Sequence, residues 1–160
     1  MSEAVLGVVL VDHGSRAAES NALFERFVEL FAARTEHAIV EPAHMELAEP
    51  SLEQAFARCV ERGASRVYVA PYFFAPGKHW RVDLPALAAA AAATVSAAVG
   101  RELSWLVGQP LGLHEALVSV VEDRLQHCLS HADGAGESCA ACADTGRCRF
   151  KTSSGSDPSL

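Results

Sequence analysis

The hydrophobic residues of this chain alternate between continuous apolar runs and apolar stripes at helical spacing. Four runs are typical of strands buried on both faces of a parallel sheet, and they span residues 4–11, 38–45, 66–74 and 103–108. A helical stripe follows each run, at residues 18–34, 51–62, 83–100 and 112–131. This alternation predicts an α/β fold: a four-stranded parallel sheet with helices on both faces and right-handed crossovers.

Residues that favour helix ends support these boundaries. Ser51 or Glu49 can cap the second helix. The third helix is expected to begin at Asp83 or Leu84, because Pro85 is acceptable only in the first turn of a helix. The residues that connect the third strand to this helix are therefore expected to form a loop.

The composition changes after about residue 131, where Gly, Ser, Asp and Cys replace the apolar stripes. We therefore predict two parts: an α/β domain over residues 1–131 and a Cys-containing, largely flexible extension over residues 132–160. Within the extension, residues 151–160 have the composition of a disordered tail.

The charge balance narrows the range of partners. The formal net charge of −7 argues against nucleic-acid binding, which requires a basic face. No segment has the pattern of a secretory signal or a membrane span, so we expect a cytoplasmic protein with no membrane partner; a plastid is the alternative if a transit peptide precedes the sequence. Positive charge gathers locally in Arg16, Lys78 and Arg81, and a site beside them can attract an anionic ligand.

Two histidines follow apolar runs: His13 in the segment VDHGSR and His79 in the segment PGKHWRVDLP. The carboxyl ends of parallel strands form the ligand crevice of an α/β sheet. Imidazole binds divalent first-row metals and takes up protons near neutral pH, so two imidazoles at this edge favour chemistry on a metal ion. The alternatives are that His13 only caps its loop or is a phosphorylated nucleophile. Asp12 argues against the latter, because a phosphohistidine pocket would have Arg there.

Glu46 and His44 lie near the end of the second predicted strand. Glu46 is expected at the same edge as the two histidines, where a carboxylate can accept a proton; the alternative is an ordinary solvated acid. For His44 we favour a strand residue whose hydrogen bonds are satisfied within the fold.

Aromatic and anion-binding side chains flank the same positions. Phe74 and Trp80 offer flat apolar walls that suit a flat ligand, and Trp80 is hard to explain as core because Lys78 lies beside it. Phe74 can alternatively be ordinary core. Ser15 and Arg16 can bind an anion at the start of the first helix.

Three segments together resemble a known family. They are residues 13–16 (HGSR), 45–51 (MELAEPS) and 71–79 (PYFFAPGKH), the last followed by DLP at 83–85. In this order they resemble the class II tetrapyrrole chelatases, and within them the small sirohydrochlorin chelatases of the CbiX/SirB type. The resemblance covers about residues 5–125.

The resemblance implies insertion of a divalent metal, Fe²⁺ or Co²⁺, into sirohydrochlorin for siroheme or cobalamin biosynthesis. It implies that His13 and His79 bind the metal and act in catalysis, and that Glu46 occupies the family's acidic position. The substrate is then a planar macrocycle fringed with carboxylates, for which the candidate binding residues are Ser15, Arg16, Phe74, Lys78, Trp80 and Arg81. Because the chain carries one set of β-α units, it resembles the members that form homodimers rather than the two-lobed chains.

Three of the five cysteines lie close together in the extension: Cys139, Cys142 and Cys148. A C-x₂-C pair can bind one metal from a tight turn, and an odd number of cysteines without a signal peptide argues against a disulfide framework. Some plant-type sirohydrochlorin ferrochelatases resemble this arrangement, which implies a [2Fe–2S] cluster with Cys128 or a cysteine of a second subunit as the fourth ligand. Structural zinc, with His127 or His131, and free thiols that hand metal to the site are the alternatives.

We therefore expect a sirohydrochlorin chelatase. Fe²⁺ is the favoured metal because the Cys-containing extension resembles the ferrochelatase branch, with Co²⁺ and Ni²⁺ as alternatives. The second hypothesis is a non-catalytic protein that binds metal or tetrapyrrole and delivers it to another enzyme. Such a protein would bind its ligands without accelerating metal insertion.

Overall fold

The computed structural model describes residues 4–143 and 145–151. The elements follow in the order β1 (Leu6–Asp12), α1 (Ala18–Arg34), β2 (Ile39–His44), α2 (Leu52–Glu61), β3 (Arg66–Pro71), η1 (His79–Asp83), α3 (Leu84–Val99), β4 (Ser104–Val107) and α4 (Glu115–Ala132). Of the tail predicted at residues 151–160, all but Lys151 lies outside the described residues.

The strands form one four-stranded parallel sheet in the order β2-β1-β3-β4. The predicted sheet is therefore confirmed. The pairing of β1 continues to Asp12 opposite His44 on one side and to Val11 opposite Pro71 on the other. As a result, β1, β2 and β3 end at the same edge of the sheet.

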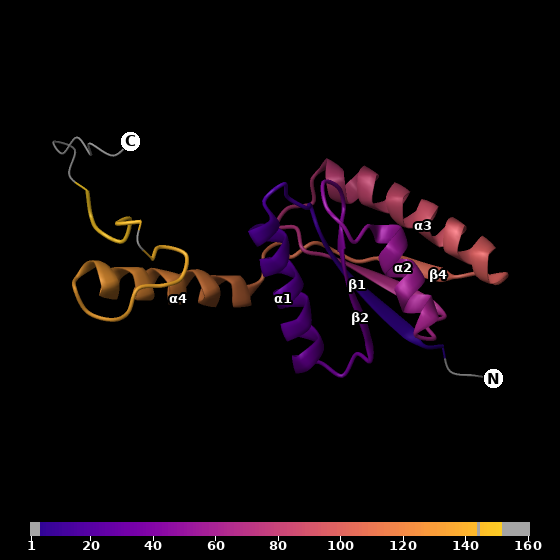
Figure 1. Cartoon of the computed structure of the whole chain (residues 1–160), viewed down its shortest axis with the longest axis horizontal. Coiled ribbons are helices and arrows are strands. Elements are labelled where there is room, and N and C mark those ends of the chain that lie inside the picture. The colour runs from indigo at the N-terminus through magenta and orange to yellow at the C-terminus, as the bar shows by residue number, and fades with distance from the viewer. Residues whose placement is uncertain (1–3, 144, 152–160) are drawn as a thin grey trace. The chain divides into compact units, whose positions relative to one another are not determined.

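Helices cover both faces of the sheet, as the continuous apolar runs predict (Figure 1). Successive side chains of a strand point to opposite faces. Val9 and Val11 of β1 belong to the core cluster that α2 and α3 cover. Val8 and Leu10 of the same strand belong to the second cluster, together with Phe24 of α1.

The contacts within the chain divide it into two compact units, residues 1–112 and residues 113–160. The first unit contains the sheet with α1, α2 and α3, and the second contains α4 and the segment with the clustered cysteines. The boundary predicted after residue 131 lies inside the second unit.

The helix that follows β3 begins earlier than predicted. The π-helical turn η1 runs directly into α3, so residues 79–99 form one helix and His79 stands on its first turn rather than in a loop. In a regular α-helix the ring of Pro85 would collide with the carbonyl four residues earlier. A wider π turn, closed by the hydrogen bond from the Leu84 N–H to the His79 carbonyl, gives that ring room.

The helix over residues 79–99 is long and apolar enough to cross a membrane by length and composition, with a mean hydropathy of 1.7. Its buried residues are Leu84, Ala88, Ala91, Ala92 and Val95, all members of the core cluster beneath α2 and α3. The core helix of an α/β protein passes the same test of length and hydropathy, and we interpret this segment as such a helix.

Gly7 of β1 contacts α2 with no room for a side chain. A Cβ at this position would lie 2.9 Å from Cβ and Sγ of Cys59 and 3.1 Å from Cβ of Ala64. Cys59 is fully buried, and this burial raises the pKa of its thiol to about 12. Cys59 is therefore a packing residue. The close approach of β1 and α2 at this point depends on Gly7 having no side chain.

Gly7→Ala is expected to lower the free energy of unfolding by about 1–3 kcal/mol, because the added methyl group overpacks the contact with α2. Gly77→Ala is the matched control, since a Cβ at Gly77 meets nothing within 4 Å. Urea denaturation of the three proteins measures the difference. Equal stability of both variants would show that α2 adjusts without cost.

Candidate functional site

The loops that follow β1 and β2 are joined by backbone hydrogen bonds at the carboxyl edge of the sheet. The Met45 N–H donates to the Asp12 carbonyl (2.9 Å), and the Glu46 N–H donates to the His13 carbonyl (3.2 Å). Gly14 has a φ of +84°, and a Cβ there would collide with the Glu46 carbonyl oxygen. Glycine alone combines this conformation with this close approach. The residue after His13 is therefore dictated by the geometry of the two loops.

The imidazoles of His13 and His79 face each other at this edge. Their ring centroids are 4.5 Å apart, and the ring planes meet at 61°. The two side chains are 44% and 51% exposed, so both rings are open to a ligand. The structure thus brings together, within one chain, the two histidines that the sequence analysis selects.

A carboxylate lies beside Nδ1 of each ring. Oε1 of Glu46 is 3.4 Å from Nδ1 of His13, without the geometry of a hydrogen bond. Oδ2 of Asp83 is 2.9 Å from Nδ1 of His79, with that geometry. Among the described residues, no hydrogen bond engages Nε2 of either ring. Nε2 is therefore the atom that each ring can offer to a metal ion.

Asp83 is a residue of the site that the sequence pattern indicates only as the start of a helix. It lies four residues after His79 on the helical turn, and side chains at this spacing are neighbours. The spacing of four residues between His79 and Asp83 indicates a contact only once η1 is known to be helical. A carboxylate bound to one imidazole nitrogen fixes the tautomer and the orientation of a metal-binding ring.

The two aromatic residues predicted near His79 differ in exposure: Phe74 is exposed, and Trp80 is held by a hydrogen bond. Phe74 is 66% exposed. Trp80 packs against the larger core cluster, and its Nε1–H donates to the carbonyl of Gly108 (2.7 Å). Trp80, which the sequence makes hard to explain as core, is in fact half-buried at the margin of the core, because its indole N–H reaches the buried carbonyl of Gly108. Of the two predicted walls, only Phe74 extends freely into solvent.

Ser15 holds the start of α1. Its Oγ accepts the N–H of Ala17 (3.0 Å). The side chain of Asn21 accepts the Ser15 N–H (2.9 Å) and donates to the Ser15 carbonyl (2.8 Å). The Ser15 N–H that could bind an anion is thus already engaged within the loop, whereas the hydroxyl is used only as an acceptor.

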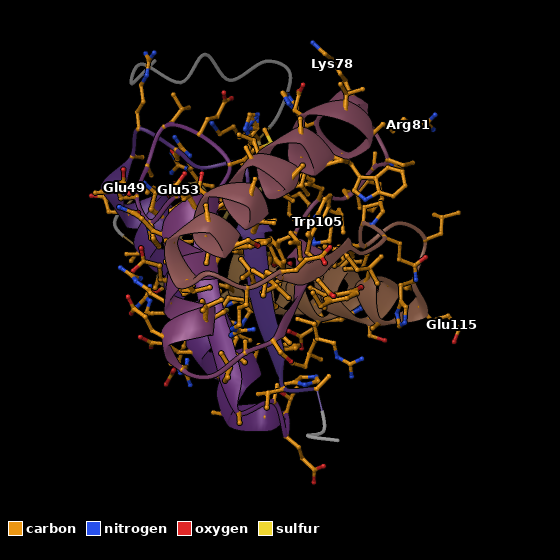
Figure 2. The ribbon with its side chains drawn as sticks, turned by 90° about the vertical axis from the view of Figure 1, so that its right-hand side faces the viewer. Glu49, Glu53, Lys78, Arg81, Trp105 and Glu115 are labelled. Carbon is orange, nitrogen blue, oxygen red and sulfur yellow. The ribbon has the colours of Figure 1, made fainter. Side chains whose placement is uncertain are left out.

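The three cations predicted near the site are exposed. Lys78 and Arg81 both extend outward from the ribbon (Figure 2). Arg81 is partly held, since its Nε donates to the carbonyl of Pro76 (2.7 Å). Arg16 follows His13 by three residues on the β1–α1 loop. All three positive charges therefore lie on segments adjoining the two histidines.

Leu47 follows Glu46 in an unusual conformation. Its φ is +66°, and its side chain is exposed. A branched aliphatic residue rarely adopts the left-handed region, and such strain is concentrated at functional sites. No sequence pattern indicates this feature, because nothing in the composition of the loop marks the conformation.

The second unit brings the clustered cysteines together. The thiol of Cys142 is hydrogen-bonded to the thiols of Cys148 and Cys139, and these bonds raise its pKa to about 11. The backbone N–H of Cys142 donates to the sulfur of Cys139 and lowers the pKa of that thiol. Cys128 is exposed, and with Cys142 and Cys148 it lines a cavity of about 230 Å³.

These thiols do not form a closed coordination shell. Within the part of the chain that the structure describes, no three His, Cys, Asp or Glu residues are placed to hold one metal ion. His127 and His131 do not line the cavity. Three thiols nevertheless lie close together, and the lowered pKa of Cys139 favours the thiolate form that binds metals.

Comparison with known proteins shows the family to which the chain belongs. Residues 7–128 match the family described as CbiX. The chain belongs to the CbiX family. It is 51% identical over 148 residues to the chloroplastic sirohydrochlorin ferrochelatase of Arabidopsis thaliana, which covers 92% of this chain and 64% of the relative. It is 40% identical over 78 residues to the sirohydrochlorin cobaltochelatase of Methanococcus maripaludis, which covers 49% of this chain and 54% of the relative. This CbiX chain therefore spans between half and two thirds of these relatives' length.

Solved structures of CbiX proteins and related chelatases share the fold. A cobalamin-biosynthesis CbiX protein from Marinobacter aquaeolei superposes with a TM-score of 0.62 at 29% identity, covering 79% of this chain and 98% of the other. The sirohydrochlorin chelatase SirB from Bacillus subtilis, in complex with cobalt, superposes with a TM-score of 0.68 at 28% identity, covering 76% of this chain and 50% of the other. The present chain thus matches a whole small CbiX chain and one half of SirB.

Asp83→Asn is expected to weaken Co²⁺ binding about 10- to 100-fold, because the amide no longer holds the ring of His79 as a carboxylate does. Titration of the protein with Co²⁺, followed by visible absorption, measures the affinity. Glu53→Gln, which removes an exposed carboxylate of α2 on the side of the molecule away from Lys78 and Arg81 (Figure 2), is the control and should bind as the unchanged protein does. Equal affinities for all three would exclude Asp83 from the site.

Proposed function

We propose that the protein inserts a divalent metal, Fe²⁺ or Co²⁺, into sirohydrochlorin, in the biosynthesis of siroheme or cobalamin. The observation that carries the proposal is the pair of exposed, facing imidazoles of His13 and His79 at the edge where three strands end. Membership of the CbiX family and relatives named as sirohydrochlorin ferrochelatase and cobaltochelatase support it.

The reaction exchanges one metal ion for two protons. The incoming ion must lose its water ligands, and two pyrrole N–H bonds must break as bonds to the metal form. Nε2 of His13 and Nε2 of His79 can hold the dehydrating ion on one face of the ring. The pyrrole protons then need an acceptor, and the exposed carboxylate of Glu46 or one of the imidazoles can take them.

The surroundings of the histidines suit a flat anionic substrate. Arg16, Lys78 and Arg81 give a locally positive rim to a chain whose net charge is −7, so a carboxylate-fringed ring is attracted to this edge rather than to the rest of the surface. The exposed ring of Phe74 provides an apolar surface beside them. We assign substrate binding to these four residues before Ser15 and Trp80, because the backbone N–H of Ser15 and the indole N–H of Trp80 already donate hydrogen bonds within the fold.

Fe²⁺ is the favoured metal. The Arabidopsis ferrochelatase matches 148 residues of this chain, whereas the match to the Methanococcus cobaltochelatase extends over 78. Co²⁺ and Ni²⁺ are the alternatives, since imidazole binds all three ions. The Arabidopsis relative is chloroplastic, so a plastid is the alternative to the cytoplasm that we predict from the sequence.

The clustered cysteines are proposed to hold a [2Fe–2S] cluster, with structural zinc as the alternative. The proximity of the thiols of Cys139, Cys142 and Cys148, and the position of Cys128 on the cavity that Cys142 and Cys148 line, support the proposal, although the four thiols would have to move closer together to bind one cluster. Such a cluster would supply one-electron redox chemistry, and no step of metal insertion requires it.

A homodimer is proposed on two grounds. The chain matches 50% of the SirB chain, so a second copy can provide what the other half of that chain provides. The apolar stripe of α4 has no buried residue, and Leu23 and Leu30 of α1 are also exposed. Apolar surface of this kind marks an interface, and the molar mass in solution, by light scattering, tests it.

His13→Ala and His79→Ala are each expected to lower the rate of metal insertion at least about 100-fold, because a ligand of the ion is lost. The assay incubates the protein with sirohydrochlorin and Fe²⁺, Co²⁺ or Ni²⁺ and follows the visible spectrum. His37→Ala, which removes an exposed histidine at the opposite end of the strands, is the control and should keep full activity. Full activity in both site variants would reject the site. Binding without turnover in the unchanged protein would favour a delivery protein.

Cys142→Ser is expected to abolish the iron–sulfur absorption of anaerobically purified protein, because this thiol contacts both of its neighbours. Iron and sulfide analysis gives the stoichiometry. Cys59→Ala changes a buried thiol outside the motif and should leave the absorption unchanged. A colourless protein with stoichiometric zinc would exclude the cluster.

A further inference from the structure

His44 is a buried imidazole that metal insertion, as derived above, does not use. It ends β2, its side chain has no exposed surface, and it packs on the ring of Phe24. Nδ1 lies 2.5 Å from Oδ1 of Asp12. Because a carboxylate oxygen only accepts, the proton of this bond is on Nδ1. Nε2 has no hydrogen-bond partner among the described residues and lies 3.6 Å from Oε1 of Glu25.

Asp12 connects this buried ring to His13. The same oxygen that accepts from His44 also accepts the N–H of Gly14 (3.0 Å). An aspartate that binds the N–H two residues ahead closes an Asx turn. The central residue of this turn is His13, so the backbone that carries the reactive imidazole is held in place by the Asp12 carboxylate.

His44 also begins the loop that carries Glu46. Its N–H donates to the Pro50 carbonyl (2.8 Å), which closes the base of that loop. The Glu46 N–H donates in turn to the His13 carbonyl (3.2 Å). The His44–Asp12 bond is therefore a side-chain tie between the two loops that present His13 and Glu46.

Stability alone does not account for this pair. A buried ionic or polar pair commonly contributes no more to stability than apolar residues of similar volume, and His44 leaves one ring nitrogen without a partner. The neighbouring core positions of β1 and β3 are filled by Val, Leu and Ala. Apolar packing is not directional, whereas the hydrogen bond from His44 fixes the orientation of the Asp12 carboxylate. This orientation is what the site gains from a histidine at position 44.

We propose that His44 is a positioning residue for metal insertion: through Asp12 it fixes the turn that holds the ring of His13 opposite the ring of His79. The role rests on the proposed function, and it concerns the same site. It requires the Nδ1–H donor of His44 and does not require Nε2.

Two amide substitutions separate the two nitrogens. In His44→Asn the amide nitrogen takes the place of Nδ1, so the donor to Asp12 is kept. In His44→Gln the amide nitrogen takes the place of Nε2, so that donor is lost while a polar group of similar size remains. Glu25→Gln removes the carboxylate that faces Nε2 and is the control.

The rate of insertion into sirohydrochlorin and the affinity for Co²⁺ in the absence of tetrapyrrole are measured for each variant. His44→Asn and Glu25→Gln are expected to stay within about 3-fold of the unchanged protein, and His44→Gln is expected to lose about 10- to 100-fold in both quantities, as for other residues that orient metal ligands. The melting temperature of each variant is recorded in parallel.

Equal losses in the Asn and Gln variants, or losses that follow the melting temperature alone, would overturn the proposal, because they indicate a role in folding. Unchanged Co²⁺ affinity in His44→Gln would overturn it as well. If the unchanged protein binds Co²⁺ but does not insert it, the proposed function fails, and the Co²⁺ affinities of the Asn and Gln variants still decide whether His44 positions His13.

Discussion

The parallel pairing of β1 with both β2 and β3 is the constraint on which the site depends. Since the register carries Asp12 to a position opposite His44 and Val11 opposite Pro71, the three strands end together. The chain must leave the sheet three times at one edge, and each departing segment carries one of the groups that meet there: His13, Glu46 and His79. A sheet buried on both faces leaves only its strand ends free to carry polar side chains.

The site is held by three kinds of contact that act at different distances from the reacting atoms. Nearest are the carboxylates of Glu46 and Asp83 beside the two imidazoles. Behind them, backbone hydrogen bonds join the β1–α1 and β2–α2 loops, and Gly14 allows their close approach. Deeper still, the indole of Trp80 fastens the π turn to the carbonyl of Gly108. Each set of contacts restricts the movement of the groups nearer the two imidazoles, and the proposed metal binding would benefit from rings held in fixed orientations.

The sequence predicts most of the fold because two-sided burial produces apolar runs that turn residues interrupt. The boundaries of α1 are those expected from its periodicity, and Ser51 caps α2 with Gln54 completing a capping box. The convergence of His13 and His79 also follows, since strand ends meet in a parallel sheet. The π turn at residues 79–83 could not be predicted, because Pro85 is also compatible with a helix that begins at Asp83 or Leu84. Asp83, the anchoring of Trp80 and the left-handed Leu47 depend on contacts or dihedral angles that no local pattern records.

One hydrogen bond of the π turn joins the reactive edge to the interior. The N–H of Leu84, whose side chain is completely buried, donates to the carbonyl of His79. A single hydrogen bond thus connects the backbone of His79 to Leu84, whose side chain is closely packed in the core. A change of side-chain volume around Leu84 is therefore expected to shift the backbone that carries the ring of His79. The sizes of aliphatic side chains that never reach this edge of the sheet are thus constrained by the position that His79 must hold.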